Sequence, residues 1–413
     1  GARRLMSRPG ASAGPHPASI ILLDYLEGGL PTPVLDDVRR HLTRCRDCRR
    51  QLTDICGAVE EIERLPSTEH VGARDDPPRC TPIDRAEGFR YLTRLTRTAL
   101  EAFIEHADPR APVLNRPVHE TAKIGADNPD NYYQHANISG AFEYRIRGKR
   151  NTIHYLDFGT QSPGVASTGD SKQGGHLDAK DIEIGPDGRF EILLSSTPKP
   201  GNWLRMTPET SALIVRQTHL DRSKEIPAEL VLERIGGEGT PRNLTPEAMD
   251  AGLKQAAGMI VGCTALFSNW AQGFRDKHCN QLPKFDDSIS MGAGGDPNIC
   301  YYHSYWQLGP EDALVIEVTP PECESWNFQL DNHWMESLDY RYYTIHVNKH
   351  TAVYEPDGSV RIVVAHEDPG VPNWINTVGH AQGTMCFRWI RAKSHPQPRT
   401  RVVKRSELKG LAR

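Results

Sequence analysis

The sequence predicts an α+β protein in which a small N-terminal helical zinc domain precedes a β-rich region. That region is expected to hold two similar antiparallel domains, jelly-roll- or sandwich-like, with a helical insertion between them. Three observations support this fold class. Apolar residues repeat at helical spacing near the N-terminus and in two later segments. From about residue 111, short alternating apolar and polar runs end at turn residues. Several of these runs recur in the same order further along the chain.

Length, charge and cysteine content restrict the class of protein. A chain of 413 residues suits two or three domains of about 150 residues each. Its 49 basic and 53 acidic residues give a net charge of −4, which argues against direct, non-specific binding of nucleic acid. We expect no membrane span, because no apolar run approaches about 18 residues. The N-terminus lacks the apolar core of a secretory signal, and one close cysteine pair among nine cysteines indicates reduced thiols, so we expect a cytoplasmic protein.

Helix signals can be followed in order from the N-terminus. Residues 17–27 form a short amphipathic pattern that ends at Gly28-Gly29, because glycine readily leaves a helix. Thr32-Pro33 supplies an N-cap and a first helical position for a second helix, and a third follows from about Arg46. A longer helical pattern runs from Asp84 to His106.

Changes in composition place the domain boundaries. A segment rich in proline and charge separates the N-terminal helices from the longer helix. A helical stretch from Thr245 to about Phe274 then interrupts the alternating runs. The expected parts are a helical zinc domain at 1–64, a linker at 65–82, a helix packing on the β region at 83–110, a first β domain at 111–244, a helical insertion with a Gly-rich loop at 245–295 and a second β domain at 296–413.

The two β domains resemble each other in sequence, which predicts an internal duplication. A single Pro-Asp-Gly hairpin turn is common, but several matched features in one order are not. The alternative is two unrelated sheets that use the same turn. The matched features are the turns at 186–188 and 356–358, the pairs Asn202-Trp203 and Asn373-Trp374, the arginines Arg216 and Arg388, and, upstream, Gly148 over Gly309.

The N-terminal segment carries the most specific chemical motif. His41, Cys45 and Cys48 form a His-x3-Cys-x2-Cys run. On a helix, positions i and i+4 share a face, and Cys-x2-Cys is a common zinc-binding spacing. Tetrahedral structural zinc needs a fourth ligand, for which His16 is the first candidate, with Cys56 and Cys80 as alternatives. The motif therefore predicts one structural zinc ion, and a redox switch at the cysteine pair is the lesser alternative.

The same run, with DYLEGGLPTP and VRRHLTRC around it, resembles the zinc-binding anti-sigma factor family over roughly residues 14–64. The resemblance implies a zinc-binding helical domain that holds a sigma factor as its partner. The alternative is a zinc site that only stabilises a small helical module, because about 50 residues bury little core.

The rest of the chain, about residues 83–410, resembles a bacterial family known as domain of unknown function 1214. The resemblance implies a two-part β fold and brings no established reaction, so function must be argued from the residues. It is carried by the segments at 84–101, 123–140, 201–206, 323–341 and 366–389.

Aromatic and polar residues concentrate near the C-terminus. Aromatic walls with a few fixed polar groups suit a sugar, a sterol or another bulky hydroxylated ligand. The alternative is that tryptophan and asparagine fix the β loops, which we favour for the two Asn-Trp pairs because they occur in both domains. The predicted ligand-binding residues are Trp326, Asn332, Trp334, Asp339 and Trp374, and the candidate catalytic residues are His366, Asp368, His380 and Arg388.

Other motifs give weaker signals. His366-x-Asp368 with His380 resembles the ligand set of non-haem iron oxygenases, and so do His176-x-Asp178 and His219. In both cases a hydrogen-bonded loop is the simpler interpretation. The segment DNPDNYY at 127–133 suggests a cluster of Asx turns, with a binding loop as the second interpretation. The chain shows no P-loop, no Gly-x-Ser-x-Gly elbow and no dinucleotide fingerprint, which argues against nucleotide-driven chemistry and common serine hydrolysis.

Two hypotheses of function follow. In the first, the zinc-binding, anti-sigma-like head is joined to a β-rich region that binds or senses a hydroxylated or glycan-like small molecule. In the second, the β region is an enzyme that acts on such a molecule through the His/Asp cluster of the second β domain, and the zinc head is an accessory. The sequence favours the first slightly, because the zinc motif is its most specific functional signal, and it leaves enzymatic activity open.

Overall fold

The structure is a computed structural model that describes residues 32–45, 81–162 and 173–411. Two compact units divide the chain, Gly1–Arg85 and Ala86–Arg413. The predicted helices at 17–27 and from Arg46, the linker up to residue 80, and the zinc candidates His16, Cys48, Cys56 and Cys80 lie outside the described residues.

The described part of the first unit contains helix α2 (Thr32–Arg44). Val38, Leu42 and Cys45 are buried, as expected for one apolar face with spacings of four and three residues. The Cys45 amide donates to the His41 carbonyl at 2.9 Å, so the helical geometry that brings positions i and i+4 together extends to this pair.

Helix α4 (Pro82–Leu100) begins with a reciprocal cap. The Thr81 amide donates to Asp84 Oδ2 at 2.9 Å, and the Asp84 amide donates to Thr81 Oγ1 at 3.2 Å. Such a capping box satisfies amides that a helix N-terminus otherwise leaves unpaired. The helix continues as a short π-helical turn, η2 (Glu101–Glu105), close to the end at His106 that the apolar spacing predicts.

The first β module consists of two four-stranded sheets around one core. Buried apolar side chains from both sheets, such as Ile146, Phe158, Ile192 and Val215, form this core. One sheet has the order β1 (Asn131–Asn137), β7 (Ala212–Thr218), β3 (Tyr155–Gln161), β4 (Gln173–Asp178). The other has the order β6 (Trp203–Arg205), β5 (Arg189–Ser195), β2 (Tyr144–Lys149), β8 (Glu229–Arg234).

The second β module repeats this arrangement around a core that includes Trp326, Phe328, Phe387 and Trp389. Its first sheet has the order β9 (Ile299–Gln307), β15 (Gln382–Ile390), β11 (Ser325–Leu330), β12 (His346–Asn348). Its other sheet has the order β14 (Trp374–Asn376), β13 (Val360–Ala365), β10 (Asp312–Val318), β16 (Arg399–Lys404).

Strand order is therefore the same in both modules, with β1, β2 and β3 equivalent to β9, β10 and β11. Most strand pairs are antiparallel, as the sequence predicts, but β5–β6 and β13–β14 are parallel, which was not expected. The upstream part of the sequence match is out of register. Gly148 lies within β2, whereas Gly309 lies in the turn between β9 and β10, so the two glycines are not equivalent.

Each parallel pair is stabilised by the same Asn-Trp contact. The Asn202 amide nitrogen donates to the carbonyls of Glu183 and Glu191, both at 2.9 Å. Asn373 donates in the same way to the carbonyls of Val353 and Arg361, both at 2.8 Å. The indole nitrogens of the tryptophans that follow them also donate to backbone carbonyls of their modules. These pairs therefore have the structural role favoured from the sequence.

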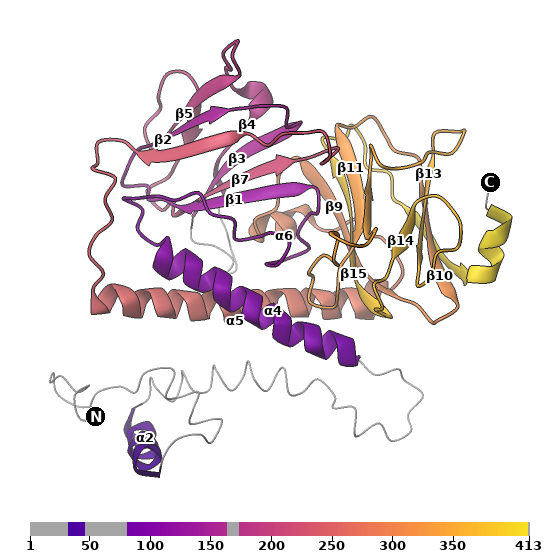
Figure 1. Ribbon diagram of the computed structural model, residues 1–413, viewed down its shortest axis with the longest axis horizontal. Helices are drawn as coiled ribbons and strands as arrows, with labels where there is room; N and C mark the ends of the chain where they lie inside the picture. The colour runs from indigo at the N-terminus through magenta and orange to yellow at the C-terminus, as the bar shows by residue number, and fades with distance from the viewer. Residues whose placement is uncertain (1–31, 46–80, 163–172, 412–413) are drawn as a thin grey trace. The chain divides into compact units, whose positions relative to one another are not determined.

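Helix α5 (Pro246–His278) connects the two modules. It begins at the N-cap Thr245, whose hydroxyl accepts from the Ala248 amide at 3.2 Å, and it is followed by the short α6 (Asp287–Gly292). In Figure 1 the modules lie side by side, and in this view α5 runs beneath the first module and reaches the near side of the second. Two short 3₁₀ helices, η3 (Ala179–Asp181) and η4 (Arg405–Leu411), complete the described elements.

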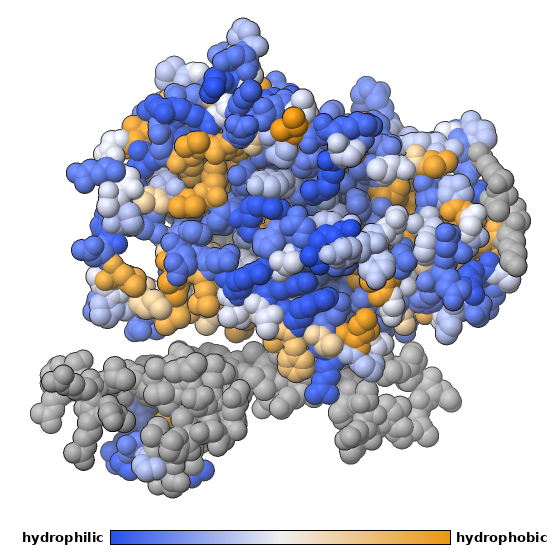
Figure 2. Space-filling model, in the orientation of Figure 1, coloured by the Kyte–Doolittle hydropathy of each residue, from blue (hydrophilic) through white to orange (hydrophobic). Residues whose placement is uncertain are grey.

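The face of the molecule in Figure 2 is mostly hydrophilic and carries several separate hydrophobic patches. None of the described helices combines the length and the apolar character that a membrane-spanning helix needs.

Candidate functional site

A cavity of about 980 Å³ lies between the two modules, bounded by the α4–η2 helix and by α5. Its volume is near the upper end of the range typical of small-molecule pockets, about 300–1,000 Å³. Helix α5 contributes one face, on which Met259, Cys263 and Phe267 follow each other at helical spacing. Strands β1, β7, β9 and β15 contribute polar side chains opposite it.

Most of the cavity wall is apolar. Such a wall gains free energy by taking apolar ligand surface out of water, at roughly 25 cal/mol per Å². The larger apolar lining residues are Phe103, Val118, Ile124, Ile138, Ile214, Met259, Phe267, Trp270 and Ile299.

The polar wall is built from the same residue types in both modules. On β1, Tyr133 and His135 line the cavity two positions apart, and on β9 Tyr301 and His303 do the same. Side chains two apart on a strand share a face, so each strand presents both rings to the cavity. An arginine completes each set, because Tyr133 pairs with Arg216 on β7 in the strand register and Tyr301 pairs with Arg388 on β15.

The two arginines differ in their partners. Arg216 pairs with Asp157 on β3, with 3.6 Å between its Nη1 and Asp157 Oδ2, and it donates to the Gly294 carbonyl at 2.7 Å. The position equivalent to Asp157 is Asn327, which lies opposite Arg388 in the register of β11 and β15. One carboxylate of the first module is therefore a neutral amide in the second.

Arg388 is buried and has neutral hydrogen-bond partners. It donates to Gln329 Oε1 at 2.5 Å, to Asn327 Oδ1 at 3.4 Å and to the carbonyl of Ala126. Among the described residues no carboxylate forms an ion pair with it. A buried charge without a counterion is costly, so this side of the cavity favours an anionic or strongly hydrogen-bonding ligand group.

The two cavity histidines are neutral. Burial lowers the pKa of His135 to about 4, and burial together with the nearby Arg388 lowers that of His303 to about 3. The His303 ring stacks between Tyr301 and Phe274, with centroid distances of 5.5 and 5.9 Å. Its Nδ1 atom has no hydrogen-bond partner among the described residues. These rings can therefore exchange hydrogen bonds with a ligand without adding charge.

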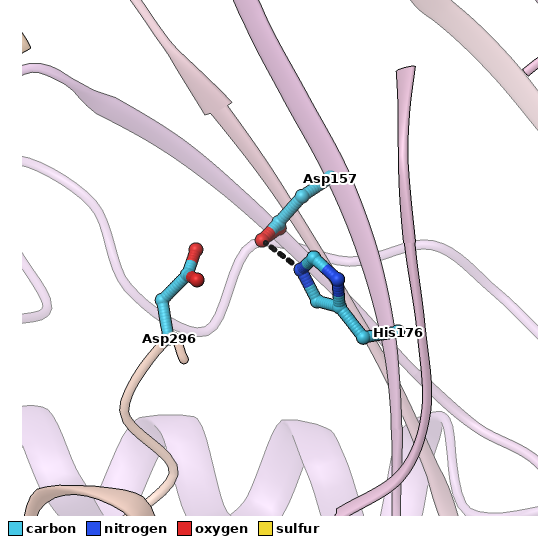
Figure 3. A group of neighbouring side chains, drawn as sticks. All are labelled: Asp157, His176 and Asp296. Atoms are coloured by element: carbon cyan, nitrogen blue, oxygen red, sulfur yellow. Dashed lines mark hydrogen bonds and ion pairs between the residues drawn. The ribbon is translucent and has the colours of Figure 1, made fainter. Parts of the chain in front are cut away.

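A second cluster of chemically active side chains lies beside Arg216. Asp157 on β3, His176 on β4 and Asp296 in the segment before β9 offer ligand atoms that all lie within 4.8 Å of one another (Figure 3). His176 Nε2 and Asp157 Oδ2 are 3.3 Å apart, and the Tyr155 hydroxyl donates to Asp296 Oδ2 at 3.0 Å. This set could hold a metal ion.

Behind the cavity, polar side chains of the 127–133 segment meet the second module. The Asn327 amide donates to Asn128 Oδ1 at 2.6 Å and to Asp130 Oδ2 at 3.0 Å. The Asp130 amide donates to Asn128 Oδ1 at 3.0 Å, which is the Asx-turn geometry predicted for this segment. Asn128 and Tyr133 also line the cavity, so the segment contributes to its wall as well.

Of the residues predicted to bind ligand or to catalyse, Arg388 is the one that lines the cavity. Trp326 is fully buried and stacks on Phe387 at 5.6 Å, so it is part of the core of the second module. Trp334 is also buried and stacks on Tyr91 of α4 at 6.4 Å. The structure therefore does not assemble the predicted tryptophans into a binding wall.

The predicted polar ligand-binding residues fix loops. Asn332 accepts from the amides of Trp334 and Glu336 in a tight turn, at 2.9 and 3.1 Å. Asp339 forms a bidentate pair with Arg341, and the Trp374 indole donates to the Ala365 carbonyl at 3.0 Å. Hydrogen bonds to nearby groups thus hold all three side chains in place.

The candidate catalytic set His366, Asp368 and His380 is not gathered around one point. His366 Nδ1 contacts the Thr377 hydroxyl at 2.9 Å, while Asp368 accepts from the Gly370 amide in an exposed turn. His380 is buried, and its Nε2 lies 2.8 Å from Glu87 Oε2 on α4.

The second predicted set of metal ligands contributes a single member to the observed cluster. His176 is in the cluster, but Asp178, the last residue of β4, pairs with Arg391 instead. His219 lies elsewhere and contacts the Asp130 carbonyl at 3.2 Å. The actual neighbours of His176 come from β3 and from the start of the second module, which sequence spacing could not show.

Sequence reasoning missed Tyr133, His135, Tyr301 and His303. A signal was present, because Tyr-x-His occurs in Tyr-Gln-His at 133–135 and in Tyr-Tyr-His at 301–303. The features matched between the two domains all lie downstream of this motif, and Gly148 and Gly309 are not structurally equivalent, so the repeat of the motif was missed.

Fold and cavity together define a two-module β protein with an internal cavity between its modules. A solved structure of an uncharacterised protein from Burkholderia cenocepacia is 46% identical to this chain, with a TM-score of 0.79; the match covers 94% of this chain and 100% of that one. The chain belongs to the family of this Burkholderia protein. A family profile described as protein of unknown function (DUF1214) matches residues 313–394, within the second module.

A structure from Vibrio parahaemolyticus is 12% identical, with a TM-score of 0.45, over 77% of this chain and 98% of that one. No curated protein matches the chain significantly.

Proposed function

We propose that the β region binds a small, largely apolar molecule that carries an anionic group, and that this molecule occupies the cavity between the modules. The single observation that carries the proposal is Arg388, a buried arginine on the polar wall of a largely apolar cavity, hydrogen-bonded to neutral groups. An acidic ligand would supply its counterion. The neutral rings of His135 and His303 would accept or donate hydrogen bonds to further polar groups, such as hydroxyls.

A fluorescent polyene fatty acid and its methyl ester test this proposal. The two probes share the apolar chain and differ in charge, so we expect the acid to bind more tightly. Replacing Arg388 by methionine should weaken binding of the acid by about tenfold or more, because a hydrogen bond to a charged group contributes about 1.5–3 kcal/mol. Binding of the ester should change little, and Arg388→Lys should restore part of the preference.

Two further variants serve as controls for this test. Arg189→Met removes an exposed arginine outside the cavity and should leave both affinities unchanged. Ala212→Trp fills the cavity without removing any of the hydrogen bonds to Arg388, and it should abolish binding of both probes. Equal binding of acid and ester by the unmodified protein, or full binding by Ala212→Trp, would contradict the proposal.

We also propose that each module has a jelly-roll- or sandwich-like fold and that the two arose by duplication. The support is the shared strand order, the repeated Asn-Trp contact and the repeated Tyr-x-His and arginine positions. On this proposal, two related sheets, one from each module, together line the cavity.

For the N-terminal segment we propose a zinc-binding head that docks on a sigma factor, as its resemblance to anti-sigma factors implies. Within the described residues, His41 and Cys45 lie one helical turn apart. Elemental analysis of protein purified without chelator should find zinc, and one equivalent per chain should be lost in a Cys45→Ser/Cys48→Ser variant. Zinc content that is zero, or unchanged in the variant, would contradict the zinc head, and failure to co-purify any sigma factor with zinc-loaded protein would contradict the partner.

A further inference from the structure

The cluster of Asp157, His176 and Asp296 has the donor atoms and the spacing of a metal site. Two carboxylates and an imidazole converge in Figure 3, each from a different segment of the chain. Metal–ligand bonds of about 2.0–2.2 Å place neighbouring ligand atoms about 3–4 Å apart. The 3.3 Å between His176 Nε2 and Asp157 Oδ2 lies within that range, and the remaining atoms need only a small inward movement.

Charge at this cluster is not balanced by the protein alone. Asp157 is fully buried and Asp296 is 1% exposed, and within the described part of the chain Arg216 is the one guanidinium that forms an ion pair with either of them. Two buried carboxylates therefore face one guanidinium, which leaves an excess of buried negative charge. A shared proton between the two carboxyl groups or a bound cation would remove it.

The orientation of the Asp157 carboxylate favours a bound cation over a shared proton. Arg216 and His176 both approach its Oδ2 atom, whereas Oδ1 is buried and has no hydrogen-bond partner among the described residues. An unpartnered carboxylate oxygen inside such a cluster is available to a metal ion. His176 is 23% exposed, which gives an ion a route from solvent and leaves room for water ligands.

We propose that Asp157, His176 and Asp296 bind one divalent first-row metal ion, such as Mn²⁺. Two carboxylate oxygens and one imidazole nitrogen suit such ions better than ions that prefer thiolates. The ion would join β3 and β4 of the first module to the segment that leads into β9 of the second. None of the three side chains lines the cavity, so this proposal stands independently of the proposed ligand.

Titration of the full-length protein with Mn²⁺ alone, followed by electron paramagnetic resonance and calorimetry, tests the site. After chelator treatment and desalting, we expect one Mn²⁺ per chain and a higher unfolding temperature with the metal. Asp157→Asn and Asp296→Asn should each weaken binding by at least about tenfold and remove the thermal stabilisation. Circular dichroism of each variant shows whether it is folded.

Asp178→Asn is the matched control, because it removes a carboxylate two residues from His176 that pairs with Arg391 instead. It should bind Mn²⁺ like the unmodified protein, and Cys45→Ser should do so too. Loss of binding in Asp178→Asn with retention in folded Asp157→Asn would overturn the assignment. The assignment would also be overturned if neither Mn²⁺ nor Zn²⁺ bound in a way that Asp157→Asn weakens. The cluster would then be a pair of carboxyl groups that share a proton.

Discussion

Asp331 is a buried carboxyl group whose protonation affects the stability of the fold. Its Oδ1 atom accepts from the Gln329 amide at 2.5 Å, while Oδ2 has no hydrogen-bond partner among the described residues. Burial, reinforced by the nearby Asp127 and opposed by Gln329, Arg388 and Lys123, raises the pKa of Asp331 from 3.8 to about 8. The folded protein therefore holds this proton more tightly than the unfolded chain does.

The sign of the pH dependence follows from this difference. The stabilising contribution of the proton is fully present below about pH 4 and is lost as the pH rises toward about 8. Each tenfold difference in proton affinity corresponds to about 1.4 kcal/mol, so the total is of the order of several kcal/mol. We expect Asp331→Asn to be less sensitive to pH between about 5 and 8 than the unmodified protein.

Urea unfolding at both ends of this range measures the effect. Asp339→Asn serves as the control, because the hydrogen bonds from Arg341 lower the pKa of Asp339 and its ionised form is the stabilising one. That variant should retain the pH dependence due to Asp331. An unchanged pH dependence in Asp331→Asn would show that the carboxyl group is ionised in the folded protein.

At the scale of the secondary-structure element, helix α4 is positioned by a glycine. A Cβ atom at Gly88 would come within 2.7 Å of the indole ring of Trp334, so this helix packs closely on the second module only because position 88 has no side chain. Glu87, its neighbour, approaches His380 Nε2 at 2.8 Å. A buried contact and a charged contact thus fix the same turn of the helix.

Two glycine-to-alanine substitutions test this packing. Gly88→Ala should destabilise the protein by about 1–3 kcal/mol, the usual cost of overpacking. Gly273→Ala on α5 is the matched control, because nothing lies within 4 Å of a Cβ atom there, and it should stabilise by about 0.5–1 kcal/mol through its better helix propensity. Thermal or urea unfolding of both variants measures the difference, and equal effects would exclude a steric role for Gly88.

Considered as a whole molecule, the protein shows which features its sequence could predict. Mixed α and β structure, two β regions and the helices around residues 84–106 and 245–274 follow from local periodicity and turn residues, and the structure contains them. Trp326 and Trp334 looked like ligand contacts because a sequence does not show which face of a strand or loop is covered. They are buried by packing against Phe387 and Tyr91.

The cavity and the metal cluster could not be predicted in the same way. Their residues come from strands and helices far apart in the chain, and the strand register alone brings Tyr133 to Arg216 and Tyr301 to Arg388. A shift of one residue in register turns every side chain of a strand to its other face. Arg388 is among the predicted residues because it lies in the polar cluster near the C-terminus, and the repeat of Tyr-x-His on β1 and β9 would have indicated the tyrosines and histidines.

The exchange of Asp157 for Asn327 at equivalent positions has a consequence for any occupant of the cavity. Because the two modules contribute similar walls to the cavity, an elongated molecule could bind in two nearly equivalent orientations that are reversed with respect to each other. A carboxylate neutralises the arginine of one wall, while the arginine of the other keeps its charge. The two orientations then differ in binding free energy, so a difference of one side chain is enough to favour one orientation of the ligand over the other.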